Sequence, residues 1–125
     1  MPALDRQHLG ADAEDAACAQ ALARGMSLLA RNVRFRFGEL DLVLRDGDTI
    51  VFVEVRRRKA SRFGDGAASI DRRKRRRLIL AARAWLARRP GGERWACRFD
   101  VASVRADGDA LRVDWIRDAF DADDG

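Results

Sequence analysis

The segment Glu39–Arg57 constrains the fold most, because two alternating runs of residues flank the turn sequence Asp46-Gly47-Asp48. Alternation of this kind predicts β-strands, and an Asp-Gly turn between two such runs predicts an antiparallel hairpin. We expect the strands at Glu39–Arg45 and Thr49–Arg57. One face should be purely aliphatic, with Leu40, Leu42, Leu44, Val51, Val53 and Val55. The other face should carry Glu39, Asp41, Val43, Ile50, Phe52, Glu54 and Arg56.

The register of this hairpin decides which acids meet. A two-residue turn at Gly47-Asp48 pairs residues whose numbers sum to 95, so Asp41 lies opposite Glu54 and Glu39 opposite Arg56. A turn at Asp46-Gly47 changes the sum to 93 and places Glu39 opposite Glu54, with every face unchanged. Opposed side chains have Cβ atoms about 5 Å apart, and like charges there cost stability. Either two acids hold a divalent cation such as Mg²⁺ or Mn²⁺, or neighbouring arginines neutralise them on a solvated face.

The rest of the chain completes an α/β pattern. In the strand that should precede the hairpin, Val33, Phe35 and Phe37 share one side. The further expected elements are a helix over Leu9–Arg24 ended by Gly25, a strand over Leu28–Phe37, a helix over Asp71–Arg89 with Asp71 as N-cap, and strands over Trp95–Arg105 and Ala110–Ile116. The order α-β-β-β-α-β-β predicts a mixed sheet with flanking helices in one domain, residues 1–117. An acidic tail, residues 118–125, should be frayed.

Positive charge is concentrated in one part of the chain. The whole chain has a net charge of +5, but the segment Arg56–Arg77 holds eleven basic and two acidic residues, a local charge of +9. Such a concentration favours a polyanionic partner, although a solvated basic helix face has the same composition. No apolar run is long enough to span a membrane and the start lacks a signal-peptide pattern, so we expect a cytoplasmic protein without membrane contact.

Several motifs together resemble one protein family. The main ones are Gly38-Glu39-Leu40-Asp41-Leu42-Val43 and Val51-Phe52-Val53-Glu54-Val55-Arg56-x-Arg58. Further matches are Gly10-x-x-x-Glu14, Leu29-Ala-Arg-Asn32, Phe63-Gly64, Lys74 and Arg98-Phe99-Asp100-Val101. In this order, and over nearly the whole chain, they resemble the YraN-like family of small bacterial proteins. That family is similar to restriction-endonuclease-like nucleases and Holliday-junction resolvases, which carry a D…(D/E)-x-K core on a hairpin.

The resemblance implies a restriction-endonuclease-like fold and hydrolysis of phosphodiester bonds, in DNA more than in RNA. It places the core acids at Asp41 and Glu54 as ligands of Mg²⁺ or Mn²⁺, with Glu14 as an accessory metal ligand. The chain departs from the pattern at Arg56, where a lysine is expected. Arginine can stabilise charge on a phosphorus centre but stays protonated and cannot act as a base. Glu39 is an accessory residue that could orient Arg56.

Two other functions remain open at the level of sequence. Arg56 favours a non-catalytic DNA- or RNA-binding module on a decayed nuclease scaffold, and a protein–protein adaptor has no specific support. A homodimer would suit cleavage of two strands, although no apolar face in the sequence predicts one. The residues expected to contact nucleic acid are Arg57, Arg58, Lys59, Arg62, Arg72, Arg73, Lys74, Arg76 and Arg77.

Overall fold

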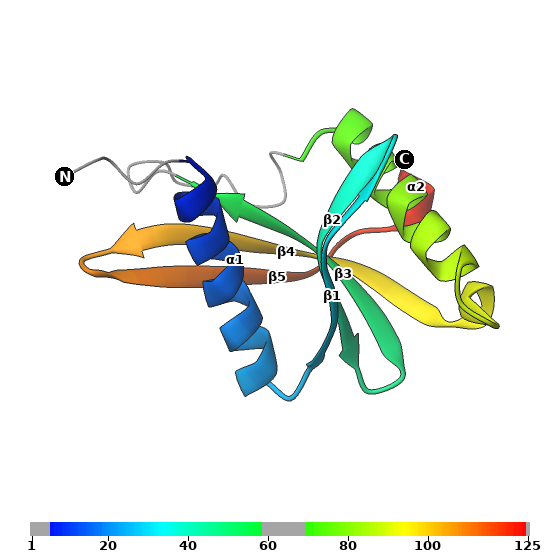
Figure 1. Ribbon diagram of the computed structural model, residues 1–125, viewed down its shortest axis with the longest axis horizontal. Helices are drawn as coiled ribbons and strands as arrows, with labels where there is room; N and C mark the ends of the chain where they lie inside the picture. Colours follow the sequence, from blue (N-terminus) through cyan, green and yellow to red (C-terminus); the bar gives the residue numbers. More distant parts are fainter. Residues whose placement is uncertain (1–5, 59–69, 125) are drawn as a thin grey trace.

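The computed structural model describes residues 6–58 and 70–124, which form a five-stranded mixed sheet with one long helix on each side (Figure 1). The strands lie in sequence order, and all neighbours are antiparallel except β3 and β4. The predicted order α-β-β-β-α-β-β is confirmed. The elements are α1 (Arg6–Ala23), β1 (Ser27–Phe35), β2 (Gly38–Asp46), β3 (Thr49–Arg57), α2 (Arg72–Ala87), β4 (Ala96–Asp107) and β5 (Ala110–Phe120), with short 3-10 turns η2 (Gly92–Arg94) and η3 (Ala122–Asp124).

The helix ends follow the predicted capping residues. Gly25 has a φ of 91° just after α1, a conformation that glycine adopts without a steric penalty. At the start of α2, the Asp71 side chain accepts a hydrogen bond of 2.8 Å from the amide of Lys74. This N-cap fixes the first turn of α2, which carries most of the basic residues. Neither α1 nor α2, the two long helices among the described residues, is long and apolar enough to span a membrane.

The sheet separates two apolar cores. On the α2 side, Phe52 packs edge-on against Trp85 and in a stacked arrangement against Phe99. On the α1 side, the small residues Ala17 and Ala21 let the helix approach the aliphatic side chains of β2 and β3. Burying a large apolar side chain contributes roughly 1.5–3 kcal/mol relative to leaving it exposed. These two cores hold the sheet rigidly between the helices.

The hairpin register matches the first of the two predicted alternatives. The pairs Asp46–Thr49, Leu44–Val51 and Leu42–Val53 place the turn at Gly47-Asp48, where Gly47 has a φ of 61°. The ladder between β2 and β3 begins at Leu42–Val53 and does not include Asp41 or Glu54. The two strands therefore separate at the position where the predicted acids lie.

The prediction that Leu40 shares a face with Leu42 and Leu44 is wrong. Leu42 and Leu44 pack in the α1-side core, but Leu40 packs in the α2-side core. The pairing of β1 with β2 passes from Arg31–Leu42 to Val33–Leu40, and Asn32 between them has a φ of 52°. A left-handed residue interrupts strand alternation. In β2 the alternation is broken between Leu40 and Leu42, the residues on either side of Asp41, because they lie in different cores.

The prediction of a frayed tail from Asp118 is also wrong for the first residues of that tail. β5 continues to Phe120, which is buried and stacks on Phe99 with ring centroids 4.8 Å apart. The amide of Asp118 donates a 2.9 Å hydrogen bond to the buried carboxylate of Asp100. Asp100 also accepts hydrogen bonds from Arg98 and Trp115. Together these contacts anchor the end of β5.

Candidate functional site

Asp41 occupies the point where β2 and β3 separate. Its Oδ2 accepts a 2.8 Å hydrogen bond from the backbone amide of Val55. The carboxylate thus satisfies a β3 amide that would otherwise need a backbone partner on β2. This bond fixes the position of the Asp41 side chain at the C-terminal end of β3.

Glu54 lies beside Asp41 and is itself buried, with 8 % of its side chain exposed. Burial and the neighbouring charge of Glu54 raise the pKa of Asp41 from its usual value of 3.8 to about 8, against the opposing effect of the Val55 amide. Glu14 and Glu39 also raise the pKa of Asp41, so all four carboxylates act on one region. The structure brings Asp41 and Glu54 together as the register predicts.

Lys74 of α2 forms an ion pair with Glu54, one of these two acids. Its Nζ lies 2.9 Å from Oε1 of Glu54, and 53 % of its side chain remains exposed. Lys74 is predicted from the sequence as a phosphate contact, and this ion pair is not predicted. The sequence signals for Lys74 are its place among the family motifs and its position three residues after the helix cap Asp71. The site therefore contains a lysine from α2, although the β3 position two residues after Glu54 is Arg56.

Arg56 lies on β3 next to Ser103 of β4 in the sheet register. It lines a small cavity of about 90 Å³ together with Ile70, Asp71 and Lys74. Arg56 and Lys74 thus border one cavity at the start of α2. Both predicted cationic groups are close to the buried acid Glu54.

The β2–β3 ladder does not extend to Glu39 and Arg56, which the predicted register places opposite each other. Glu39 forms an ion pair of 3.6 Å with Arg34, its partner in the β1–β2 register. The prediction extended the β2–β3 register beyond Leu42, where the two strands have already separated. Glu39 still borders the site, because its charge contributes to the raised pKa of Asp41.

Glu14 does not join a three-acid cluster. Arg31 holds it by an ion pair of 3.4 Å and also contacts Asp15 at 2.8 Å. Among the residues whose side chains the structure describes, 12–58 and 70–123, no three His, Cys, Asp or Glu side chains are grouped closely enough to hold a metal ion. The described residues therefore assemble the pair Asp41 and Glu54, with Glu14 nearby on α1 but engaged by Arg31.

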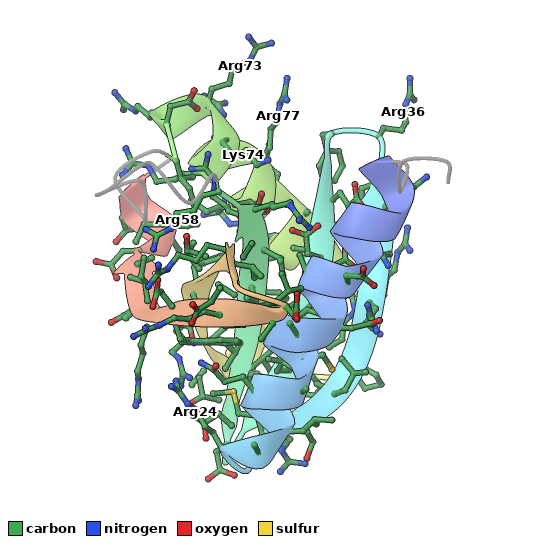
Figure 2. The ribbon with its side chains drawn as sticks, turned by 90° about the vertical axis from the view of Figure 1, so that its left-hand side faces the viewer. Arg24, Arg36, Arg58, Arg73, Lys74 and Arg77 are labelled. Atoms are coloured by element: carbon green, nitrogen blue, oxygen red, sulfur yellow. The ribbon has the colours of Figure 1, made fainter. Side chains whose placement is uncertain are left out.

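Most of the described residues that are predicted to contact nucleic acid have exposed side chains, whereas Arg58 is held in an ion pair. Figure 2 shows Arg73 and Arg77 of α2 and Arg36 of the β1–β2 turn projecting from the same end of the molecule, with Arg24 at the opposite end. Arg72 and Arg76 are also exposed on α2, and Arg57 is exposed at the end of β3. Arg58 instead forms a 2.6 Å ion pair with Asp114 of β5, and only 17 % of its side chain is exposed. Lys59, Arg62 and the Phe63-Gly64 motif lie outside the described residues.

A groove of about 540 Å³ connects this basic end with the acids. Its lining includes the cationic residues Arg34, Arg36, Lys74 and Arg77, and it reaches Glu39 and Asp41. Gly38 also lines the groove. A Cβ at this position would lie 2.7 Å from the backbone oxygen of Arg77. Only glycine permits so close an approach of α2 to the β1–β2 turn. The site thus opens into a positively charged groove.

Comparison with known proteins places the chain in a family. Residues 13–104 match the family model described as "Uncharacterised protein family UPF0102". A UPF0102 protein of Xanthomonas campestris is 55 % identical over 124 residues, which cover 99 % of each chain. A UPF0102 protein of Halorhodospira halophila is 51 % identical over 116 residues, covering 93 % of this chain and 89 % of the relative. A UPF0102 protein of Pseudomonas paraeruginosa is 50 % identical over 115 residues, covering 90 % of this chain and 92 % of the relative. The chain therefore belongs to the UPF0102 family, the YraN-like family that its motifs resemble.

Proposed function

We propose that this protein is a metal-dependent nuclease that hydrolyses phosphodiester bonds, with DNA as the preferred substrate over RNA. The observation that carries the proposal is the cluster of Asp41, Glu54 and Lys74 at the end of a basic groove. Paired carboxylates, a neighbouring lysine and a phosphate-binding surface are the components that such hydrolysis needs. The mixed sheet and the resemblance to restriction-endonuclease-like proteins support the same function. The expected location remains the cytoplasm.

The donor set at Asp41 and Glu54 fits Mg²⁺ or Mn²⁺. Both ions prefer carboxylate oxygens and retain several water ligands, so two protein carboxylates are sufficient. The raised pKa of Asp41 indicates that negative charge at this site is poorly compensated, which a cation would correct. A bound cation supplies positive charge for the scissile phosphate and lowers the pKa of a water ligand.

Each neighbouring residue has a distinct part in this proposal. Lys74 neutralises Glu54 and is exposed enough to contact a phosphate oxygen at the same time. Arg56, with its planar guanidinium, would stabilise the charge that develops on the phosphate. The exposed arginines of α2 would bind the flanking phosphates and make the affinity strongly dependent on salt.

A second candidate function is a non-catalytic nucleic-acid-binding module. The ion pair between Lys74 and Glu54 favours it, because lysine already compensates one carboxylate without a metal ion. In that case the basic groove would bind nucleic acid and the acids would serve only to position α2. Nucleic-acid binding is common to both candidates, whereas cleavage belongs to the first alone.

The test is incubation of the purified protein with labelled linear, flapped, four-way-junction and single-stranded DNA, and with single-stranded RNA. Each substrate is tested in Mg²⁺, in Mn²⁺ and with a chelator. The nuclease proposal expects cleavage of at least one substrate, abolished by the chelator and by Asp41→Asn. Salt-sensitive binding without cleavage in any metal would instead establish the binding module.

A further inference from the structure

An exposed aromatic ring lies on the groove that leads to the candidate site. Phe37, in the turn between β1 and β2, is 44 % exposed. The sequence pattern predicts Phe37 on the strand face with Val33 and Phe35, but β1 ends at Phe35. Phe37 therefore lies beyond the strand, and it lines the groove together with Asp41 and Lys74.

Phe37 is the outer member of a stack. Its ring lies 5.7 Å from that of Phe35, with an angle of 7° between the two planes. The guanidinium carbon of Arg88 in turn lies 4.8 Å from the centre of the Phe35 ring. Phe37 is 44 % exposed in spite of its contact with Phe35, so part of its surface is available for a further planar group. The stack also fixes the ring orientation before any ligand arrives.

The surroundings of Phe37 determine the chemistry of that group. Arg36 precedes Phe37 in the turn, and Arg34 and Arg77 line the same groove. Figure 2 shows Arg36 and Arg77 at the same end of the molecule. A basic groove that tracks a phosphate backbone, combined with an aromatic ring on which a base stacks, is the arrangement typical of single-strand binding. A base inside a duplex is covered on both faces by its neighbours and cannot stack on a protein ring without leaving the helix.

We propose that this groove binds a single-stranded segment of nucleic acid, with one unpaired base stacked on Phe37 and the adjoining phosphates at Arg36 and Arg77. The inference rests on the proposed function and adds a substrate class, namely single strands or the unpaired regions of branched molecules. The bound segment would extend along the groove towards Asp41 and Glu54. DNA and RNA share the stacking chemistry and are separated by the experiment.

The test measures binding by fluorescence anisotropy in the presence of a chelator, so that cleavage does not interfere. The probes are a labelled single-stranded DNA, an RNA of the same sequence and a DNA duplex of the same length. The variants are Phe37→Ala, Phe37→Leu and Phe37→Tyr. The matched control is Trp95→Ala, which removes an exposed ring next to Ile50, at the other end of β3 from Glu54. Thermal unfolding of each variant verifies the fold.

Phe37→Ala and Phe37→Leu should weaken single-strand binding about tenfold, because one stacked base is worth about 1–3 kcal/mol. Both should change duplex binding by less than about twofold, since only the phosphate contacts remain there. Phe37→Tyr and Trp95→Ala should bind like the wild type. The single-stranded probe bound more tightly, DNA or RNA, identifies the nucleic acid that the groove accommodates.

If the wild-type protein binds nucleic acid, two results would overturn this inference and leave the proposed function intact. One is unchanged single-strand binding in Phe37→Ala, and the other is an equal loss of affinity for single strand and duplex. If the wild-type protein binds none of the probes at low salt, the nucleic-acid function itself fails and the inference fails with it.

Discussion

Lys74 Nζ on α2 lies 2.9 Å from Glu54 Oε1 on β3, so an exposed helical cation compensates a buried strand carboxylate. This contact joins the basic helix to the acidic end of the hairpin. It also provides the lysine that the sequence lacks two residues after Glu54, where Arg56 stands.

Replacing Lys74 by Met should destabilise the protein, because it removes a cation that contacts the buried carboxylate of Glu54. We expect a loss of about 1–2 kcal/mol in the free energy of unfolding, less than for a fully buried pair because Lys74 is half exposed. Urea denaturation measures the loss. Arg73→Met, on the same helix turn, should change stability by less than about 0.5 kcal/mol. In a double-mutant cycle, Glu54→Gln should remove most of the effect of Lys74→Met; additive losses would contradict the ion pair.

Asp41 should make the stability of the metal-free protein fall as the pH rises. Its pKa is 3.8 when unperturbed and about 8 in the folded protein. Between these values the unfolded chain releases the proton that the folded chain retains, so stability is lost progressively and the full penalty is present above about pH 8. Asp41→Asn removes this charge while its amide oxygen can still accept the Val55 hydrogen bond. The variant should match the wild type near pH 4 and exceed it by on the order of a few kcal/mol at pH 8.

Denaturation midpoints of wild type and Asp41→Asn, measured across this pH range, test the difference directly. Titrating groups that do not interact with Asp41 affect both proteins equally and cancel in the comparison. A stability difference that does not vary with pH would show that Asp41 is ionised with an ordinary pKa. Adding Mn²⁺ should reduce the difference at pH 8, because a cation at Asp41 and Glu54 stabilises the charged form.

Asp71→Ala should loosen the first turn of α2 by removing the acceptor of the Lys74 amide hydrogen. Loss of an N-cap side chain costs typically about 1 kcal/mol, which thermal unfolding followed by circular dichroism can measure. Asp71→Asn keeps the acceptor and should retain nearly all of the stability. If the Asn and Ala variants lose the same amount, the cap is not the source of the effect.

Asp100 should be essential for the end of β5. It is buried and accepts hydrogen bonds from Arg98, Trp115 and the amide of Asp118. Asp100→Ala leaves Arg98 with less compensation and should cost about 3 kcal/mol or more in the free energy of unfolding. Hydrogen exchange at the Asp118 amide should accelerate more than exchange in β2. If the Asp118 amide exchanges as slowly in Asp100→Ala as in the wild type, its hydrogen bond to Asp100 does not protect it.

The hairpin could be predicted well because residues close together in the sequence determine its turn and its register. The sequence Asp46-Gly47-Asp48 contains a glycine that adopts a φ of 61°, and this turn sets the pairing of Leu42 with Val53. The position of Leu40 could not be predicted in the same way. Leu40 and Leu42 are two residues apart yet lie on opposite faces of the sheet, and the regular alternation of the β2 sequence does not predict this break.

The less predictable parts depend on contacts between distant segments. The ion pair of Lys74 with Glu54 requires the start of α2 to lie over the end of β3, and a count of basic residues contains no such information. Phe120 lies in an acidic part of the sequence, and its burial depends on stacking with Phe99 on the neighbouring strand β4. Likewise, Phe37 continues the alternation of β1 but lies in the turn. Local patterns thus specify the elements, and tertiary packing decides the contacts at the site.

The most direct test of the central claim is the single-turnover rate at which the protein cleaves its best substrate in Mn²⁺, compared with Glu54→Gln and Glu93→Gln. Glu93 is an exposed acid in η2, before β4 and therefore at the other end of the parallel β3–β4 pair. We predict that Glu93→Gln cleaves at the wild-type rate. Glu54→Gln should lower the rate at least about a hundredfold, which corresponds to about 3 kcal/mol in the activation barrier. Cleavage by Glu54→Gln at the wild-type rate would contradict a metal-dependent site built on Asp41 and Glu54.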